Sequence, residues 1–214
     1  MRVLITGASR GIGAGLETAY TDLGHEVIGT GRSVAAQIQL DVTQPSSHAE
    51  MAQALGDTAL DLLICNAGIY LDKGHDLNTG YGADLWAQSF ATNVTGVFLS
   101  IQALLPHLRR ARSSKIAIIS SQMASHTRAP GGSYIYRSSK AAVLNLGRNL
   151  ASDLKADGIA VGIYHPGWVQ TDMGGPEAAI TTDEAVTGLV ARFHDLGLHN
   201  TGCFETWDGR AHAY

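Results

Sequence analysis

The stretch VLITGASRGIG, residues 3–13, joins a short apolar run to three glycines with the spacing G-x-x-x-G-x-G. Such an order is typical of a first strand, a tight loop and a helix whose amino end faces an anion. Gly7 permits a sharp exit from the strand, Gly11 lets a ligand approach the backbone, and Gly13 allows close helix packing. Glycines also serve tight turns that hold no ligand, but this position after a strand predicts a dinucleotide-binding loop.

Seven apolar, strand-like runs alternate with helical segments, at residues 3–6, 26–30, 37–41, 60–66, 115–121, 159–165 and 202–206. Runs such as LLIC at 62–65 are apolar on both faces, as parallel strands covered by helices are. We therefore expect one doubly wound α/β domain over residues 1–214, with a seven-stranded, mostly parallel sheet and helices on both faces. Between Arg32 and Gln37 too little chain remains for a crossover helix, so we predict that the second crossover helix is missing.

Two longer helices are expected at residues 83–109 and 134–155, and Pro106 is expected to end or kink the first of them. Both helices carry many small and apolar residues, among them Ala141, Ala142, Leu146 and Leu150.

Composition excludes several classes of function. The chain has 214 residues and a formal net charge of −4, and its 15 lysines and arginines are scattered, which argues against nucleic-acid binding. Cys65 and Cys203 lie in apolar stretches, which predicts small buried thiols instead of a disulfide framework or a catalytic thiol. The nine histidines show no spacing with acids or cysteines that indicates a metal site. No apolar run approaches the ~18 residues of a membrane span, so we expect a soluble, cytoplasmic protein.

The residue that follows the second strand usually sets the choice of dinucleotide. An acidic side chain there binds the ribose 2′-hydroxyl, whereas a basic one pairs with a 2′-phosphate. This chain has Gly31-Arg32 and no carboxylate at that point, and Arg10 in the glycine loop offers a second guanidinium. The pattern favours NADP(H) over NAD(H), although a surface arginine is often merely solvated.

Tyr136 and Lys140 lie four residues apart in the predicted helix and therefore share a face. A free tyrosine has a pKa of ~10, so it is a poor base at neutral pH until a nearby ammonium and a cationic nicotinamide favour the phenolate. Lys140 would supply that field, and in the reduction direction Tyr136 would donate its proton to a carbonyl oxygen. Ser121, at the carboxyl end of the fifth strand, is expected to hydrogen-bond the same oxygen, although a serine there also suits a turn cap.

These motifs occur in the order found in short-chain dehydrogenases/reductases, and the chain resembles that family over essentially its whole length. Residues 6–13 match the family's cofactor loop, Asp41-Val42 its adenine-contacting pair, and Asn66-Ala67-Gly68 the turn that supports the central strand. The resemblance implies a catalytic tetrad of Asn93, Ser121, Tyr136 and Lys140, in which the asparagine helps to hold a water in a proton relay to the lysine. It also implies that the segment 166–171 passes over the nicotinamide. The cofactor-binding residues predicted from the loop and the resemblance are Gly7, Ser9, Arg10, Gly11, Ile12, Gly13, Arg32, Asp41, Val42, Asn66, Ala67, Gly68, Tyr136, Lys140, Pro166, Gly167, Val169 and Thr171.

Three further stretches, YRSSK at 136–140, HPGW at 165–168 and WDG at 207–209, resemble the small C-factor-like and carbonyl-reductase-like members. The chain between Thr171 and a helix expected near Thr182 is short, which implies an open pocket with broad specificity. The candidate substrate-pocket residues are Gln122, Met123, Tyr134, Trp168 and Met173, with Tyr70 and His126 at the rim. No dense cationic clamp for a thioester carrier is evident, and Arg128 and Arg137 are the cations that would contribute to one.

The sequence thus predicts an NADPH-dependent reductase, reversibly an alcohol dehydrogenase, that acts on a small or medium apolar ketone or aldehyde. The alternatives left open are an NAD-linked secondary-alcohol dehydrogenase, a dihydropteridine-reductase-like enzyme, and a dinucleotide-binding regulatory module without turnover. The resemblance further implies a homodimer or homotetramer in which the two long helices pair across a twofold axis.

Overall fold

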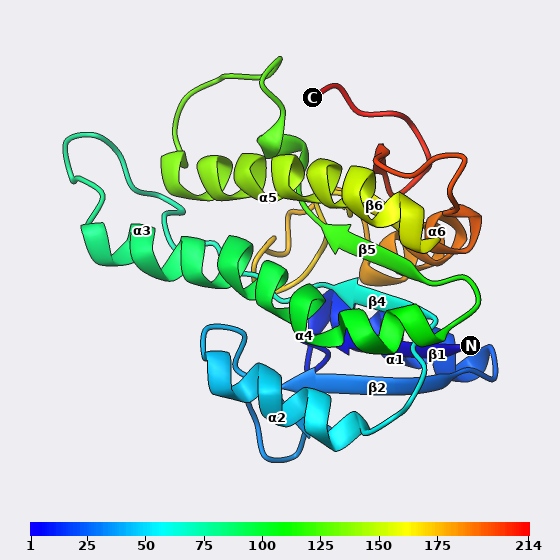
Figure 1. Ribbon diagram of the computed structural model, residues 1–214. Helices are drawn as coiled ribbons and strands as arrows, with labels where there is room; N and C mark the ends of the chain where they lie inside the picture. The colour runs from blue at the N-terminus through cyan, green and yellow to red at the C-terminus, as the bar shows by residue number, and fades with distance from the viewer.

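The computed structural model describes residues 1–214 and contains one sheet of seven parallel strands in the order β3-β2-β1-β4-β5-β6-β7 (Figure 1). The strands are β1 (Arg2–Thr6), β2 (Glu26–Gly31), β3 (Ile38–Gln39), β4 (Leu62–Cys65), β5 (Lys115–Ile119), β6 (Ala160–His165) and β7 (Phe204–Thr206). The predicted doubly wound fold with seven strands is confirmed. Several strands are shorter than predicted, and β5 in particular ends at Ile119, which leaves Ser120 and Ser121 beyond its carboxyl end.

Helices cover both faces of the sheet. They are α1 (Gly11–Asp22), α2 (Pro45–Leu55), α3 (Ala83–Phe90), the π-helical turn η1 (Ala91–Thr95), α4 (Gly96–Arg110), the 3₁₀ turn η2 (Gln122–Ala124), α5 (Tyr134–Asp153), the 3₁₀ turn η3 (Leu154–Asp157) and α6 (Thr182–Asp195). In Figure 1, α2, α4 and α5 lie on the near face of the sheet, with α1 and α6 on the far face. The helix expected near Thr182 is confirmed, and its amino end carries a capping box of Thr181 and Glu184.

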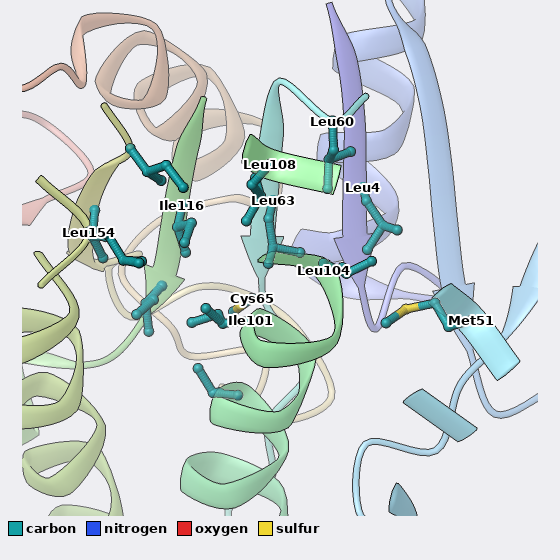
Figure 2. Close-up of a cluster of buried hydrophobic side chains, with 14 of the residues drawn as sticks. Leu4, Met51, Leu60, Leu63, Cys65, Ile101, Leu104, Leu108, Ile116 and Leu154 are labelled. Carbon is teal, nitrogen blue, oxygen red and sulfur yellow. The ribbon is translucent and has the colours of Figure 1, made fainter. Parts of the chain in front are cut away.

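Side chains alternate along each strand, so every strand contributes residues to both faces of the sheet. Leu4, Leu63 and Ile116 point to the α2, α4 and α5 side, where they pack with helix residues such as Leu104 and Met51 (Figure 2). Their neighbours along the same strands, among them Val3, Ile5, Leu62 and Ala117, pack on the other side against α1 and α6. Residues that are apolar on both faces of a strand therefore fill two cores, as a covered parallel sheet requires.

The second crossover helix is absent, as predicted. A loop joins β2 to β3, and two glutamines hold it closed: Gln37 Oε1 accepts from the Gly29 amide at 3.0 Å, and Gln39 Nε2 donates to the Arg32 carbonyl at 3.0 Å. These side chains replace the hydrogen bonds that a helix would otherwise provide.

The predicted helix over residues 83–109 is present but is not uniform. Pro106 does not end it, because α4 continues to Arg110. The regular helix is instead interrupted earlier, by the π-helical turn η1 that contains Asn93. Such turns insert an extra residue into a helix and are frequent at functional sites.

The predicted helix over 134–155 begins as expected at Tyr134, and its last regular residue is Asp153, after which η3 continues the chain. No helix has the length and apolar character that crossing a bilayer requires. Cys65 is buried and Cys203 half-buried, and both thiols are free.

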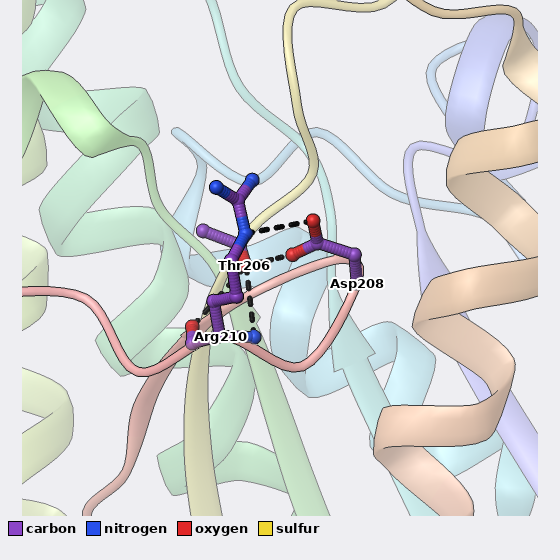
Figure 3. A network of polar contacts seen from close by, with 3 residues as sticks. All are labelled: Thr206, Asp208 and Arg210. Atoms are coloured by element: carbon purple, nitrogen blue, oxygen red, sulfur yellow. Dashed lines mark hydrogen bonds and ion pairs between the residues drawn. The ribbon is translucent and has the colours of Figure 1, made fainter.

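The WDG stretch at 207–209 forms a tight turn after β7. The Asp208 carboxylate accepts hydrogen bonds from the Thr206 hydroxyl and from Arg210 Nε, the latter at 2.8 Å (Figure 3). Gly209 adopts the left-handed conformation with φ 85°, which suits glycine. The turn sets the direction of the chain after β7. The WDG stretch therefore has a structural role.

Candidate active site

The carboxyl ends of the central strands open into a cleft of about 1020 Å³. Polar and glycine residues from several separate segments line it, and most of the predicted cofactor-binding residues are among them: Gly7, Ser9, Arg10, Gly11, Ile12, Arg32, Asp41, Val42, Asn66, Ala67, Gly68, Tyr136, Lys140, Pro166 and Thr171. Three predicted residues, Gly13, Gly167 and Val169, do not line the cleft. A cleft at this edge of a parallel sheet is where ligands of doubly wound folds bind.

The glycine loop has the geometry that its sequence predicts. Gly7 and Gly11 have φ values of 70° and 55°, a region that other residues rarely adopt. Gly13 lies against the backbone of the loop, since a Cβ there would stand 2.1 Å from the Gly7 carbonyl oxygen. Asn66 Nδ2 donates to the carbonyls of Thr6 and Gly7 at 3.1 and 2.9 Å, which ties the loop to the end of β4. The amino end of α1 therefore faces the cleft with its N–H groups available to an anion.

The two predicted phosphate-binding arginines differ in their surroundings. Arg32 lines the cleft without a salt bridge. Hydrogen bonds from Thr43 lower the pKa of the Asp41 carboxyl, and the charge of Arg32 adds to this effect. Arg10 is instead paired with Asp172 at 2.7 Å, an exposed contact between the glycine loop and the segment after β6. Arg32 is thus the better placed of the two to meet a phosphate.

Asn93 is buried and connects three parts of the site. Its amide nitrogen donates to the Ile69 carbonyl at 2.9 Å and to Ser139 Oγ at 3.0 Å, and its oxygen accepts from the Ile69 amide at 2.9 Å. The π-helical turn η1 is in this way joined to the chain after β4 and to α5. The bonds give Asn93 a positioning role that is visible in the protein alone.

Ser121, Tyr136 and Lys140 are all buried around the end of β5. Lys140 Nζ donates to the carbonyl of Ile119, the last residue of β5, at 2.9 Å, and it lies 5.7 Å from the centre of the Tyr136 ring. Ser121 Oγ accepts from the Met123 amide at 3.1 Å, and its hydroxyl is near enough to Tyr136 to act on the pKa of that phenol. The structure therefore brings all four residues of the predicted tetrad into one group.

The ionisation of this group differs from the sequence expectation. Burial raises the pKa of Tyr136 to about 12, and the nearby Ser121 hydroxyl offsets only part of that rise. Burial also lowers the pKa of Lys140 to about 8. In the protein alone, burial dominates the pKa of the phenol; the expected acidic phenol also depends on a cationic nicotinamide and stays a prediction. At neutral pH the tyrosine keeps its proton while the lysine is mostly charged.

The segment 69–72, which we call the strap, holds the start of α5 in place and was not predicted from the sequence. The Tyr70 ring stacks on Tyr136 with centroids 4.2 Å apart, and its hydroxyl bonds to Ser133, which has a left-handed φ of 49°. Asp72 is fully buried, and its carboxylate accepts the amides of Ile135 at 2.9 Å and Tyr136 at 3.2 Å. Asp72 thus caps α5 from 63 residues away in the chain, since Ser133 gives no side-chain cap.

The candidate substrate residues are more dispersed than expected. Met173 lines the cleft, and Lys73 donates to its carbonyl at 3.3 Å across the opening. Trp168 is 52% exposed, with its indole N–H bonded to the Gly174 carbonyl, and Tyr134 packs edge-on against Tyr81. Gln122 and Met123 line a different, smaller cavity. Of the rim residues, Tyr70 belongs to the strap and His126 is exposed.

Residues 1–180 match the family model described as short chain dehydrogenase. The chain belongs to the short-chain dehydrogenase family. It is 36% identical over 154 residues to C-signal of Myxococcus xanthus, an alignment that covers 70% of this chain and 90% of that protein. It is 32% identical over 224 residues to 1-hydroxy-2-glutathionyl-2-methyl-3-butene dehydrogenase of a Rhodococcus species, which covers 97% and 96% of the two chains.

The fold also matches solved members of the family. The crystal structure of NADPH-bound carbonyl reductase from chicken fatty liver superimposes with a TM-score of 0.91 and 31% sequence identity. That superposition covers 100% of this chain and 98% of the other. The likeness extends through the whole sheet and its helices, including the region beyond residue 180.

The capping by Asp72 leads to a first prediction. Replacement Asp72→Ala leaves two buried amides of α5 without an acceptor, which costs about 1 to 3 kcal/mol. For a chain of this size we expect a fall in Tm of roughly 2 to 12 °C by differential scanning calorimetry.

Asp76→Ala is the matched control. Asp76 accepts the amides of Asn78 and Thr79 at 2.8 Å, but it is exposed and its partners are local. Its loss should lower Tm by much less than the loss of Asp72 does, because water can replace an exposed carboxylate as the partner of these amides. Equal effects of the two substitutions would contradict the proposed capping of α5 by Asp72.

Proposed function

We propose that this protein is an NADPH-dependent reductase, reversibly an alcohol dehydrogenase, which acts on small or medium ketones and aldehydes. The observation that carries the proposal is a buried, protonated Tyr136 that lies near Ser121 and the Lys140 cation and lines a dinucleotide-sized cleft. A phenol that holds its proton at neutral pH is suited to donate it, which is the role that carbonyl reduction requires.

The cleft fits NADPH. The backbone at Gly7 and Gly11 and the amino end of α1 suit a pyrophosphate, and Asp41 and Val42 line the part where an adenine would lie. Arg32, which forms no salt bridge although its charge acts on Asp41, is proposed to pair with the 2′-phosphate. The similar chicken carbonyl reductase is described as NADPH-bound, which supports the same choice here.

NADPH would supply the hydride, and the protein's own residues would handle the oxygen and the proton. Ser121 and Tyr136 are proposed to donate their hydroxyl hydrogens to the carbonyl oxygen of a bound substrate. Tyr136 then gives its proton to the oxygen as negative charge develops. The Lys140 ammonium uses one N–H on the Ile119 carbonyl, which leaves two for the nicotinamide ribose and the proton path. Asn93 is hydrogen-bonded to Ile69 and Ser139. These bonds hold the strap and α5 in place around Tyr136 and Lys140.

We further propose that the chain acts as one domain over residues 1–214 and assembles as a homodimer or homotetramer through α4 and α5. The support is the partly exposed row of Ala141, Ala142, Leu146 and Leu150 on α5, together with exposed Phe98 on α4. Such surfaces commonly meet in isologous contacts, and light scattering gives the mass directly.

The second prediction concerns the cofactor. We expect NADPH to bind at least tenfold more tightly than NADH, a difference of about 1.4 kcal/mol that one guanidinium–phosphate pair supplies. Arg32→Ala should remove most of this preference in fluorescence titrations. Arg112→Ala, which changes an exposed arginine outside the cleft, is the control and should retain it. Equal affinities of the native protein for the two cofactors would refute the assignment.

The third prediction concerns the acid. Tyr136→Phe removes one hydroxyl, keeps the ring that stacks on Tyr70, and should lower kcat for carbonyl reduction by a factor of ~10² to 10⁴. NADPH binding and Tm should change little. Tyr20→Phe, which removes another buried hydroxyl on the far side of the sheet, should leave kcat unchanged.

Two related variants separate the roles within the tetrad. Lys140→Ala should reduce turnover and also weaken NADPH binding, because the lysine is proposed to hold the ribose. Ser121→Ala should reduce turnover alone, because its proposed partner is the substrate oxygen. Near-native activity of Tyr136→Phe on a good substrate would overturn the mechanism.

A further inference from the structure

A second cavity, of about 450 Å³, opens between η2 and the start of α5. It is lined by Gln122, Met123, Arg128, Ala129, Pro130 and Arg137, and we call it the arginine cavity. No acidic side chain lines it, although the chain as a whole carries a net charge of −4.

The two arginines of this cavity have no ionic partner. Five other arginines of the chain form salt bridges with carboxylates, and neither Arg128 nor Arg137 is among them. Arg128 Nη1 donates to Gln122 Oε1 at 2.9 Å, and Arg137 Nε donates to the Gly132 carbonyl at 3.1 Å. Each of these contacts uses one of the five N–H groups of a guanidinium, so the side chains are positioned while donors remain free.

The arginine cavity lies next to the proposed reacting groups along the chain. Gln122 follows Ser121 and Arg137 follows Tyr136, so the Cα atoms of these two cavity residues are about 3.8 Å from those of the reacting residues, although neighbouring side chains point in different directions. Burial is the main cause that lowers the pKa of His165, the last residue of β6, and the charge of Arg128 adds a smaller effect, which places that charge near the same edge of the sheet as the cleft. The arginine cavity and the cleft share no lining residue, so a substrate that uses both needs a chain of medium length between its ketone and its anion.

We infer that the arginine cavity binds a carboxylate carried by the substrate, so that the preferred substrates are keto acids instead of neutral ketones. The inference rests on the function proposed above and names its substrate class. A carboxylate matches the planar fork of a guanidinium and supplies the negative charge that the cavity lacks. Arg137 is half-buried and Arg128 exposed, so Arg137 contributes the larger share of the discrimination.

The test compares 5-oxohexanoate and 7-oxooctanoate with their methyl esters, which present the same ketone without the charge. In the native protein we expect kcat/KM for the better acid to exceed that for its ester at least tenfold. Arg137→Gln should reduce this acid-to-ester ratio to near one, mainly through a higher KM for the acid, and Arg128→Gln should reduce it in part. Arg148→Gln, an exposed arginine of the same helix outside the cavity, should leave the ratio unchanged.

If the protein reduces the esters and shows no preference for the acids, the keto-acid assignment is overturned. The proposed reductase activity would still stand. If neither class is reduced, the proposed function fails, and calorimetric titration of 7-oxooctanoate still tests the site. Binding of the acid that is lost in Arg137→Gln would support the arginine cavity, and absence of binding would overturn it. Acetate added to the ester assay gives a further check. If it changes ester turnover equally in the native and Arg137→Gln proteins, the anion acts at a site other than the arginine cavity.

Discussion

The ammonium group of Lys140 is buried at the end of β5 with a backbone carbonyl, and no carboxylate, as its partner. A buried cation without a counter-charge is unfavourable, and its cost is visible in the lowered pKa of Lys140. The elements around Lys140 are fixed in place, and they keep its side chain buried despite this unfavourable free energy. α5 is fixed at its amino end by Asp72, β5 ends where its last carbonyl can accept from the lysine, and Asn93 fastens η1 to both neighbours.

The strap is the part of the structure that connects these constraints. Its first residue, Ile69, is bound through both backbone polar groups by Asn93, its second stacks on Tyr136, and Asp72 caps the helix that carries Tyr136 and Lys140. A short stretch of chain thus holds Tyr136, which is the proposed general acid, Lys140 and Asn93 relative to one another. Precise placement of this kind is what a proton transfer requires, since a hydrogen bond weakens steeply when its geometry is lost.

Sequence reasoning succeeded where the signal is local. The glycine spacing predicts the conformations of Gly7 and Gly11, the short chain between β2 and β3 predicts the missing crossover, and the motif order predicts the tetrad that the structure brings together. It did not find Asp72, because the partners of that carboxylate are backbone amides 63 residues away that leave no mark on sequence.

Two other features depend on three-dimensional context in the same way. The sequence shows that Arg10 is positively charged. Its pairing with Asp172 could not be predicted, because it depends on the contact between the glycine loop and the segment after β6. The pKa of Tyr136 depends on how completely the ring is buried, and spacing from Lys140 alone suggested a shift in the opposite direction. Gln122 and Met123 likewise follow Ser121 in the chain yet line the arginine cavity, because η2 turns them away from the cleft.

The pH dependence of carbonyl reduction at saturating NADPH tests the central role of the buried Lys140 and Tyr136 most directly. Lys140, with a pKa of about 8, is charged below that pH and loses its proton above it, whereas Tyr136, with a pKa of about 12, stays protonated throughout. We predict a constant kcat/KM from about pH 6 to 7.5 and a decline of roughly tenfold per pH unit above about pH 8 as the cation is lost. A rate that stays constant, or rises, up to pH 10 would contradict the assignment of Lys140 as the cation that supports proton donation by Tyr136.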